Sequence, residues 1–126
     1  MSAECVLVVD DEPDLRECVS LVLREAGFEV EVAADGLEGI EKIDALHPAL
    51  VVLDLMMPKM DGWAVLRALQ ARAGAPAVVM LSAVADPRRA AREGAQACLA
   101  KPFHNKALVE VCRRVLAARQ PGDRGA

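Results

Sequence analysis

Four short apolar runs in this chain each end in a polar side chain that can take part in chemistry. The runs cover residues 6–9, 50–53, 77–81 and 97–100, and they are followed by Asp10 and Asp11, by Asp54, by Ser82 and by Lys101. Aliphatic runs of this kind are typical of buried strands in a parallel sheet. The carboxyl ends of such strands meet at one edge of the sheet, where ligands bind. We therefore expect the acids, the hydroxyl and the amine to lie together.

These side chains match the needs of phosphoryl transfer to a carboxylate. Carboxylates that lie close together are costly to ionise unless a cation joins them, and Mg²⁺ binds oxygen ligands, usually with one or two carboxylates among them. An Asp can act as the nucleophile, and the transition state requires positioning and charge neutralisation. The ammonium of Lys101 suits one phosphate oxygen, and the hydroxyl of Ser82 can donate to another. We therefore predict phosphoryl capture on Asp54 with Mg²⁺.

A simpler interpretation of the acids at positions 10–12 stays open at this point. Acidic residues are favoured at the start of a helix, and a helix is expected to begin near Pro13. Helix capping accounts well for one acid and less well for three in succession.

The apolar patterns alternate between strands and amphipathic helices. Five strands, each followed by a helix, predict an α/β fold with a doubly wound, flavodoxin-like parallel sheet, because right-handed crossovers place helices on both faces. The expected strand order is 2-1-3-4-5, with the second strand at an edge. The predicted strands are Cys5–Val9, Glu29–Ala33, Leu50–Leu53, Ala77–Leu81 and Ala97–Ala100, and the predicted helices are Pro13–Ala26, Leu37–Leu46, Trp63–Arg72, Pro87–Glu93 and Asn105–Arg119.

Helical spacing also predicts which side chains are buried. On the first helix the apolar stripe includes Cys18, whereas Ser20 belongs to the opposite face and Leu21 lies beside that polar face. All four cysteines have apolar neighbours and none has CxxC spacing, so we expect reduced, buried thiols. These cysteines are Cys5, Cys18, Cys98 and Cys112.

Length and composition limit the class of protein. A chain of 126 residues fits a single domain. It has no apolar stretch of 18 residues and no signal-peptide pattern, so we expect a cytoplasmic protein without a membrane span. The net charge is −4, with −11 on residues 1–63 and +7 on residues 64–126. The acidic half suits a divalent cation and argues against general nucleic-acid binding, while the basic half is either solvated or docks an acidic partner.

Four segments carry a resemblance to a known family. They are residues 6–16 (VLVVDDEPDLR), residues 51–62 (VVLDLMMPKMDG), the Ser82-Ala83 pair and residues 99–103 (LAKPF). Together they resemble the receiver domain of two-component response regulators, over residues 4–119. Residues 120–126 are expected to form a flexible tail or the start of a linker.

The resemblance implies a phosphorelay switch with Mg²⁺ as its cofactor. Such a protein catalyses its own phosphorylation and slow dephosphorylation and is not an enzyme for other substrates. Asp54 would be the phosphoacceptor, and Ser82 and Lys101 would contact the phosphoryl group. The implied magnesium ligands are Asp10, Asp11, Asp54 and the main-chain carbonyl of Met56.

The resemblance also implies structural residues and partners. Pro58 and Gly62 would shape the loop after the acceptor, and the peptide bond before Pro102 would be cis. The donor would be the phosphohistidine of a sensor histidine kinase or a phosphotransfer protein, docked near Leu21 and residues 101–105. The signal would pass to an effector protein or domain, from a monomer or weak dimer that does not bind nucleic acid directly.

Two departures from the family lie on the side that passes the signal onward. The family couples the residue at Ser82 to an aromatic residue on the fifth strand, but here that position is Cys98, and the chain has no Tyr. The interval from Ser82 to Gly94 is about three residues shorter than usual, nearly one helical turn, which predicts a short fourth helix. Both departures spare the pocket, so we expect phosphorylation to be kept and the readout to differ.

Two alternatives belong to other classes of protein. A pseudo-receiver would be a phosphorylation-independent protein-binding module, which the intact set of polar residues disfavours. A haloacid-dehalogenase-type phosphatase would need a second Asp two residues after Asp54, where Met56 stands. With no room for a DNA-binding domain after the receiver, we expect either a stand-alone receiver or a longer protein cut near Pro121.

Overall fold

Strands and helices alternate along the chain in the computed structural model, which describes residues 4–83 and 86–119. Their boundaries lie within two residues of the predicted ones. The strands are β1 (Cys5–Val9), β2 (Glu29–Ala33), β3 (Leu50–Asp54), β4 (Ala77–Ser82) and β5 (Ala97–Ala100), and the helices are α1 (Pro13–Glu25), α2 (Gly36–Leu46), α3 (Gly62–Gln70), α4 (Pro87–Arg92) and α5 (Asn105–Ala118).

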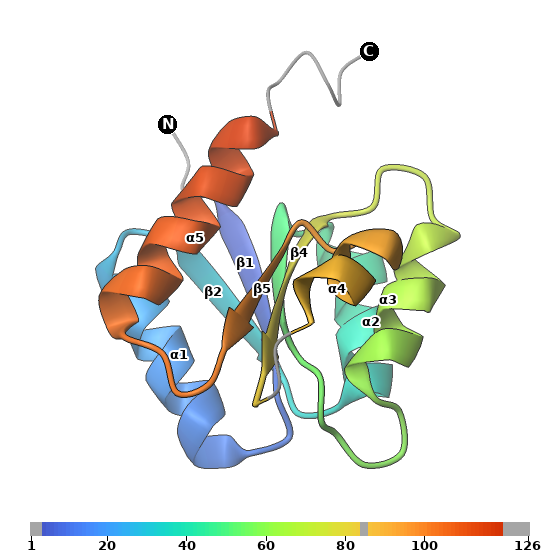
Figure 1. Ribbon diagram of the computed structural model, residues 1–126, viewed down its shortest axis with the longest axis horizontal. Coiled ribbons are helices and arrows are strands. Elements are labelled where there is room, and N and C mark those ends of the chain that lie inside the picture. The colour runs from blue at the N-terminus through green and yellow to red at the C-terminus, as the bar shows by residue number, and fades with distance from the viewer. Residues whose placement is uncertain (1–3, 84–85, 120–126) are drawn as a thin grey trace.

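The five strands form one parallel sheet in the order β2-β1-β3-β4-β5, so the predicted fold class and strand order are confirmed. Helices α1 and α5 cover one face, and α2, α3 and α4 lie on the other (Figure 1). All strands point the same way, so their carboxyl ends share one edge, at the bottom of Figure 1.

The central strands are apolar on both sides because each side faces helices. Along β1, Leu7 and Val9 pack with α2 and α3, while Val6 and Val8 pack with α1 and α5. This two-residue alternation is the pleat of a strand. The pleat therefore determines in which direction the chain leaves β1, and so where Asp10 and Asp11 lie.

The predicted face of α1 is rotated from the observed one. Ser20 is buried, 1% exposed, and Cys18 is exposed, so both predictions are wrong. The buried face is centred on Val19, Ser20 and Leu23. The Ser20 hydroxyl avoids the cost of burial because it donates to the main-chain oxygen of Arg16 at 2.7 Å.

Only one of the four predicted buried thiols is buried. Cys112 lies inside the core, and burial raises its pKa to about 12. Cys5 and Cys98 are partly exposed, because one begins β1 and the other lies on the edge strand β5.

Helix α4 has six residues and begins behind an Asp86 cap, which confirms the predicted short helix. The predicted tail at residues 120–126 lies outside the described residues. Within the described part of the chain, no helix is both long and apolar enough to cross a membrane.

Candidate functional site

Three carboxylates meet at the carboxyl edge of the sheet. Strands β1 and β3 are adjacent, with Val9 opposite Leu53, so the acids that end them are neighbours. One carboxylate oxygen from each of Asp10, Asp11 and Asp54 lies within 4.8 Å of the other two. Asp10 is 1% and Asp54 4% exposed. Burial of two acids beside a third goes beyond helix capping and is typical of a cation site.

A cation and a hydroxyl-bearing residue join the acids from the ends of β5 and β4. Lys101 Nζ donates to Asp54 Oδ1 at 2.8 Å, and the Lys101 main-chain N–H donates to the Ser82 carbonyl at 2.8 Å. Ser82 is the last residue of β4 and is 3% exposed. The bond between Lys101 and Pro102 is cis, as predicted. The structure therefore brings the predicted residues to one edge.

Asp10 has a carboxyl group whose surroundings raise its pKa. Its Oδ1 accepts from the Glu12 N–H at 2.9 Å, and its Oδ2 has no hydrogen-bond partner among the residues described. Burial raises the pKa of Asp10 to about 6; the charges of Asp54 and Asp11 raise it too, whereas the Glu12 amide and Lys101 lower it. An orphaned oxygen beside two carboxylates is a fitting ligand for a hard cation.

The loop after β3 packs tightly against the strand. The Gly62 N–H donates to the Leu55 carbonyl at 2.9 Å. A Cβ at Gly62 would lie 2.8 Å from the main-chain oxygen of Asp54 and 2.8 Å from the Leu55 Cα, so any larger residue would push the backbone apart. The Pro58 carbonyl accepts from the Met60 N–H at 2.7 Å. The main chains of Pro58 and Gly62 thus both take part in the hydrogen bonds of this loop.

An open cleft of about 520 Å³ leads to the carboxylates. Its lining residues are Asp11, Glu12, Pro13, Asp54, Met56, Ala83 and Lys101. Met56 is 70% exposed. Beside the cleft lies an apolar depression of about 470 Å³, which shares Ala83 and Lys101 with it and is otherwise lined by Leu15, Cys18, Pro102 and Phe103. The carboxylates can therefore be reached from solvent next to an apolar surface.

Strand β5, which lies between the site and α4, carries no aromatic side chain. Cys98 stands opposite Met80 and packs against the core on the α2–α3 side. Helix α4 instead contacts an aromatic ring of α3: the guanidinium carbon of Arg89 lies 4.1 Å from the centre of the Trp63 ring. Trp63 is only 9% exposed.

Sequence reasoning misses several contacts of long side chains, and two of them bear on the site and on α4. One is Arg89 on Trp63, and the other is Arg16, whose Nη1 donates to the main-chain oxygen of Asp10 at 2.8 Å. Periodicity places both arginines on polar helix faces and says nothing of what their ends touch. The one available signal for Arg16 is its position in the first turns of the helix that follows the acids.

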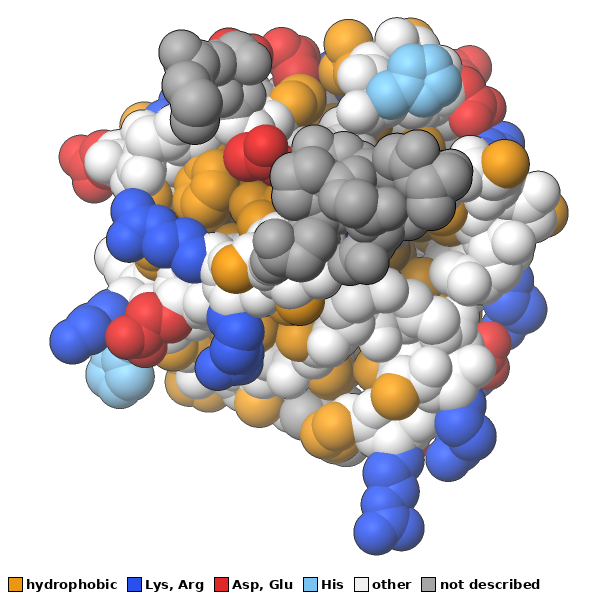
Figure 2. All heavy atoms as spheres, turned by 90° about the horizontal axis from the view of Figure 1, so that it is seen from above, with side chains coloured by type: hydrophobic (Ala, Val, Ile, Leu, Met, Phe, Trp, Pro, Cys, Tyr) orange, Lys and Arg blue, Asp and Glu red, His pale blue; other side chains and the backbone are white. Residues whose placement is uncertain are grey.

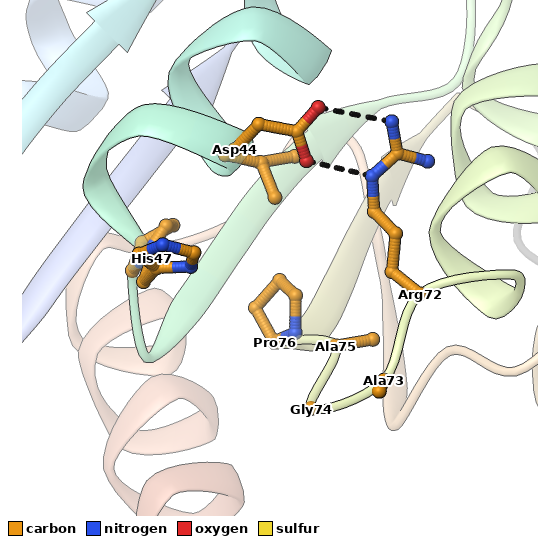
Figure 3. A pocket seen from close by; sticks show the side chains of 9 residues that line it. Asp44, His47, Arg72, Ala73, Gly74, Ala75 and Pro76 are labelled. Carbon is orange, nitrogen blue, oxygen red and sulfur yellow. Dashed lines mark hydrogen bonds and ion pairs between the residues drawn. The ribbon is translucent and has the colours of Figure 1, made fainter.

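The opposite end of the molecule has a different character. Figure 2 looks onto that end, where acidic and basic side chains are scattered. A depression of about 210 Å³ lies there between α2 and the loop after α3 (Figure 3). Arg72 Nε and Nη2 donate to the two Asp44 oxygens at 2.7 and 3.0 Å across it. This exposed pair links two elements and is remote from the acids.

Solved structures with the same fold cover nearly all of the chain. The chemotaxis protein CheY4 of Vibrio cholerae has 32% sequence identity and a TM-score of 0.85, over 90% of this chain and 99% of that one. The receiver domain of the Francisella response regulator 1452 has 27% identity and a TM-score of 0.87, over 93% and 99%. The receiver domain of NtrX from Brucella abortus has 33% identity and a TM-score of 0.83, over 89% and 98%.

Sequence relatives point the same way. The DNA-binding response regulator MtrA of Mycolicibacterium smegmatis is 43% identical over 107 residues, which are 82% of this chain and 46% of that protein. MtrA of Mycobacterium leprae is 42% identical over 82% of this chain and 47% of that protein. The chain thus spans about half the length of the curated relatives it matches. The family profile "Response regulator receiver domain" matches residues 6–113. This chain belongs to the family of response regulator receiver domains.

Proposed function

We propose that this chain is the phosphoacceptor of a two-component phosphorelay. It takes a phosphoryl group from a histidine kinase or a histidine phosphotransfer protein onto Asp54, with Mg²⁺, and then changes its protein–protein interactions. The supporting observation is the convergence of three carboxylates within 4.8 Å, with Lys101 Nζ 2.8 Å from Asp54. A pseudo-receiver that only binds a partner has no need for this costly set of charges.

The donor set fits Mg²⁺. Asp10 offers an oxygen without a hydrogen-bond partner among the described residues, and Asp11 borders the open cleft. With Asp54 and the main-chain carbonyl of Met56, these residues are the proposed ligands. When bound, the ion would neutralise negative charge as the phosphoryl group arrives.

The chain's own residues position and neutralise the reacting groups. A carboxylate oxygen of Asp54 forms the new bond to phosphorus while the phosphorus–nitrogen bond of the donor breaks, and its electron pair stays on the imidazole. Lys101 already holds Asp54 Oδ1, so we assign the attack to the other oxygen. Lys101 Nζ and the Ser82 hydroxyl then donate to phosphoryl oxygens. The burial of Asp54 limits access of water to the product.

The donor docks, in this proposal, over the apolar depression beside Lys101. Its lining joins Lys101, Pro102 and Phe103 to Leu15 and Cys18 of α1. Leu21, 51% exposed on the same helix, extends this surface. We propose a cytoplasmic location, a monomer or weak dimer, and an effector protein or domain as partner. Because the matched relatives are about twice as long, DNA binding stays a property of those whole proteins.

The proposed readout differs from the usual one. A thiol at Cys98 is too small to exchange between buried and exposed positions as a ring would. We propose that Ser82 and the short helix α4, which rests on Trp63, transmit the signal instead.

Incubation with Mg²⁺ and acetyl phosphate, followed by intact-mass measurement, tests the acceptor. One phosphoryl group should add to the wild-type chain and none to Asp54→Asn. Asp44→Asn, which changes an exposed carboxylate at the far end, should react like the wild type. No gain of mass in the wild type would instead favour the pseudo-receiver.

A further inference from the structure

Arg16 holds the main chain that carries two of the three carboxylates. Its Nη1 donates at 2.8 Å to the main-chain oxygen of Asp10. That oxygen belongs to the peptide group that joins Asp10 to Asp11, so this single bond acts on both acids. Nothing in the phosphoryl chemistry described above uses Arg16.

The other hydrogen bonds of Asp10 act on its neighbouring groups and not on the Asp10–Asp11 peptide itself. The Asp10 N–H donates to the Ala33 carbonyl at 3.1 Å, which continues the pairing of β1 with β2, and Asp10 Oδ1 accepts from the Glu12 N–H at 2.9 Å. Both fix the residue from the strand side or from within the loop. The bond from Arg16 comes from a different element, and it opposes the repulsion that pushes three neighbouring carboxylates apart.

Arg16 is itself firmly placed. Its main-chain oxygen accepts from the Ser20 hydroxyl at 2.7 Å, and Ser20 is buried. One turn of helix further, Val19 and Leu23 are fixed in the core between α1 and α5. The guanidinium therefore connects a packed helix to the loop that bears the acids, and the fork of an arginine is pre-organised for such a bond.

We propose that Arg16 is a positioning residue for the acidic cluster, which keeps the Asp10–Asp11 peptide where both carboxylates face Asp54 and bind a divalent cation. This inference rests on the proposed function in that Mg²⁺ is the cation. Loss of a group that orients metal ligands from behind lowers metal affinity by about 10- to 100-fold. Arg16 acts through the main chain, so we expect the lower end of that range.

The test is calorimetric titration of Mg²⁺ into the unphosphorylated chain. Arg16→Met removes the donor and the charge, and it should weaken Mg²⁺ binding about tenfold. Arg16→Gln keeps an N–H donor without the charge and should recover part of the affinity. The rate of reaction with acetyl phosphate at saturating Mg²⁺ should stay near the wild-type value, because Arg16 touches no reacting atom.

The chain offers a matched control on the same helix. Arg24 Nη2 also donates to a carbonyl six residues away, that of Val30, at 3.2 Å. Arg24→Met therefore removes an equal charge and a similar bond near the other end of α1, and it should leave Mg²⁺ affinity within about twofold of the wild type. Thermal unfolding of every variant shows which ones are folded, and Arg16→Lys replaces Arg16→Met if the latter is not.

The outcomes separate the two proposals. If the wild type neither binds Mg²⁺ nor is phosphorylated, the proposed function fails and this inference fails with it. If the wild type binds Mg²⁺ and the Arg16 variants bind it as tightly as Arg24→Met, only the role of Arg16 is overturned. Equal weakening by Arg16→Met and Arg24→Met also overturns it, because that points to a general loss of stability.

Discussion

At the scale of single residues, the site places the carboxyl groups of Asp10 and Asp54 where they are almost fully buried. Taking an ionised carboxylate out of water costs several kcal/mol unless a partner compensates. Lys101 compensates Asp54 directly, at 2.8 Å. The Asp10 carboxylate accepts one hydrogen bond, from the Glu12 N–H, and its other oxygen has no partner among the described residues. In the metal-free chain, the ionised form of Asp10 therefore destabilises the fold above its pKa.

This imbalance predicts a pH dependence of stability. Burial raises the pKa of Asp10 from 3.8 to about 6, so the folded chain binds this proton more tightly than the unfolded chain does. Its contribution to the free energy of unfolding is largest below about pH 4 and is lost as the pH rises through about 6. In EDTA, Asp10→Asn should therefore gain on the order of 1–2 kcal/mol over the wild type between pH 4 and 7.

Urea unfolding of both proteins at each pH measures this difference. Asp14→Asn removes a nearby acid outside the cluster and serves as the control, because it carries the same change of charge. A difference between Asp10→Asn and the wild type that does not change with pH would contradict the argument.

At the scale of elements, α4 is the shortest helix in the described part of the chain. Six residues make fewer than two turns, and such a short helix depends on its packing. Its residue Ala90 is buried, and its Arg89 covers the ring of Trp63. Trp63 follows Gly62, which touches the main chain of Asp54. Contacts therefore run from the acid edge through the start of α3 to α4.

Emission of Trp63, the only tryptophan, should report the readout. Beryllofluoride with Mg²⁺ mimics the phosphoryl group and should change this emission in the wild type, because movement of α4 moves Arg89 over the ring. In Arg89→Gln the response should fall to less than about half, since the cation–π contact is lost. Arg88→Gln, one residue away and exposed, is the control. An equal response in both variants would exclude α4 as the route.

The sequence predicts the elements and their order because each depends on local pattern. Apolar runs mark β1, β3 and β4, and the acid, hydroxyl and amine at strand ends follow from parallel topology alone. It fails at Cys18 and Ser20, because the rotation of α1 depends on how the helix packs between the sheet and α5. It also misses Arg16 and Arg89, since the ends of long side chains are placed by tertiary contacts that no periodicity encodes.

At the scale of the whole molecule, the sheet order sets two oppositely charged parts of the chain side by side. Residues 1–63, at −11, supply β2, β1 and β3, and residues 64–126, at +7, supply β4 and β5. The border runs between β3 and β4, beside Asp54. The acidic part provides the proposed metal ligands, and the basic part provides Lys101. Neither part has a complete site.

A ligand that joins carboxylates from separate elements should stabilise the whole fold. Mg²⁺ at about tenfold above its dissociation constant adds about 1.4 kcal/mol to the free energy of unfolding, and this raises the melting temperature by a few degrees. Chelation with EDTA should remove the gain. Differential scanning calorimetry should show the shift for the wild type and Asp14→Asn and not for Asp11→Asn. A shift that persists in Asp11→Asn would place the bound ion elsewhere.

The bond between Lys101 and Asp54 joins the ends of β3 and β5, which are not neighbours, and so passes over the end of β4. The distance that this bond has to span depends on the anion that Lys101 binds. A phosphoryl group makes the anion longer, so Lys101 Nζ has to move away from Asp54 to bind it, and we expect the β5–α5 loop to take up part of the movement that the flexible lysine side chain does not. That loop borders the apolar depression where we place the donor. Completion of the transfer would then alter the surface under the donor and help to eject it.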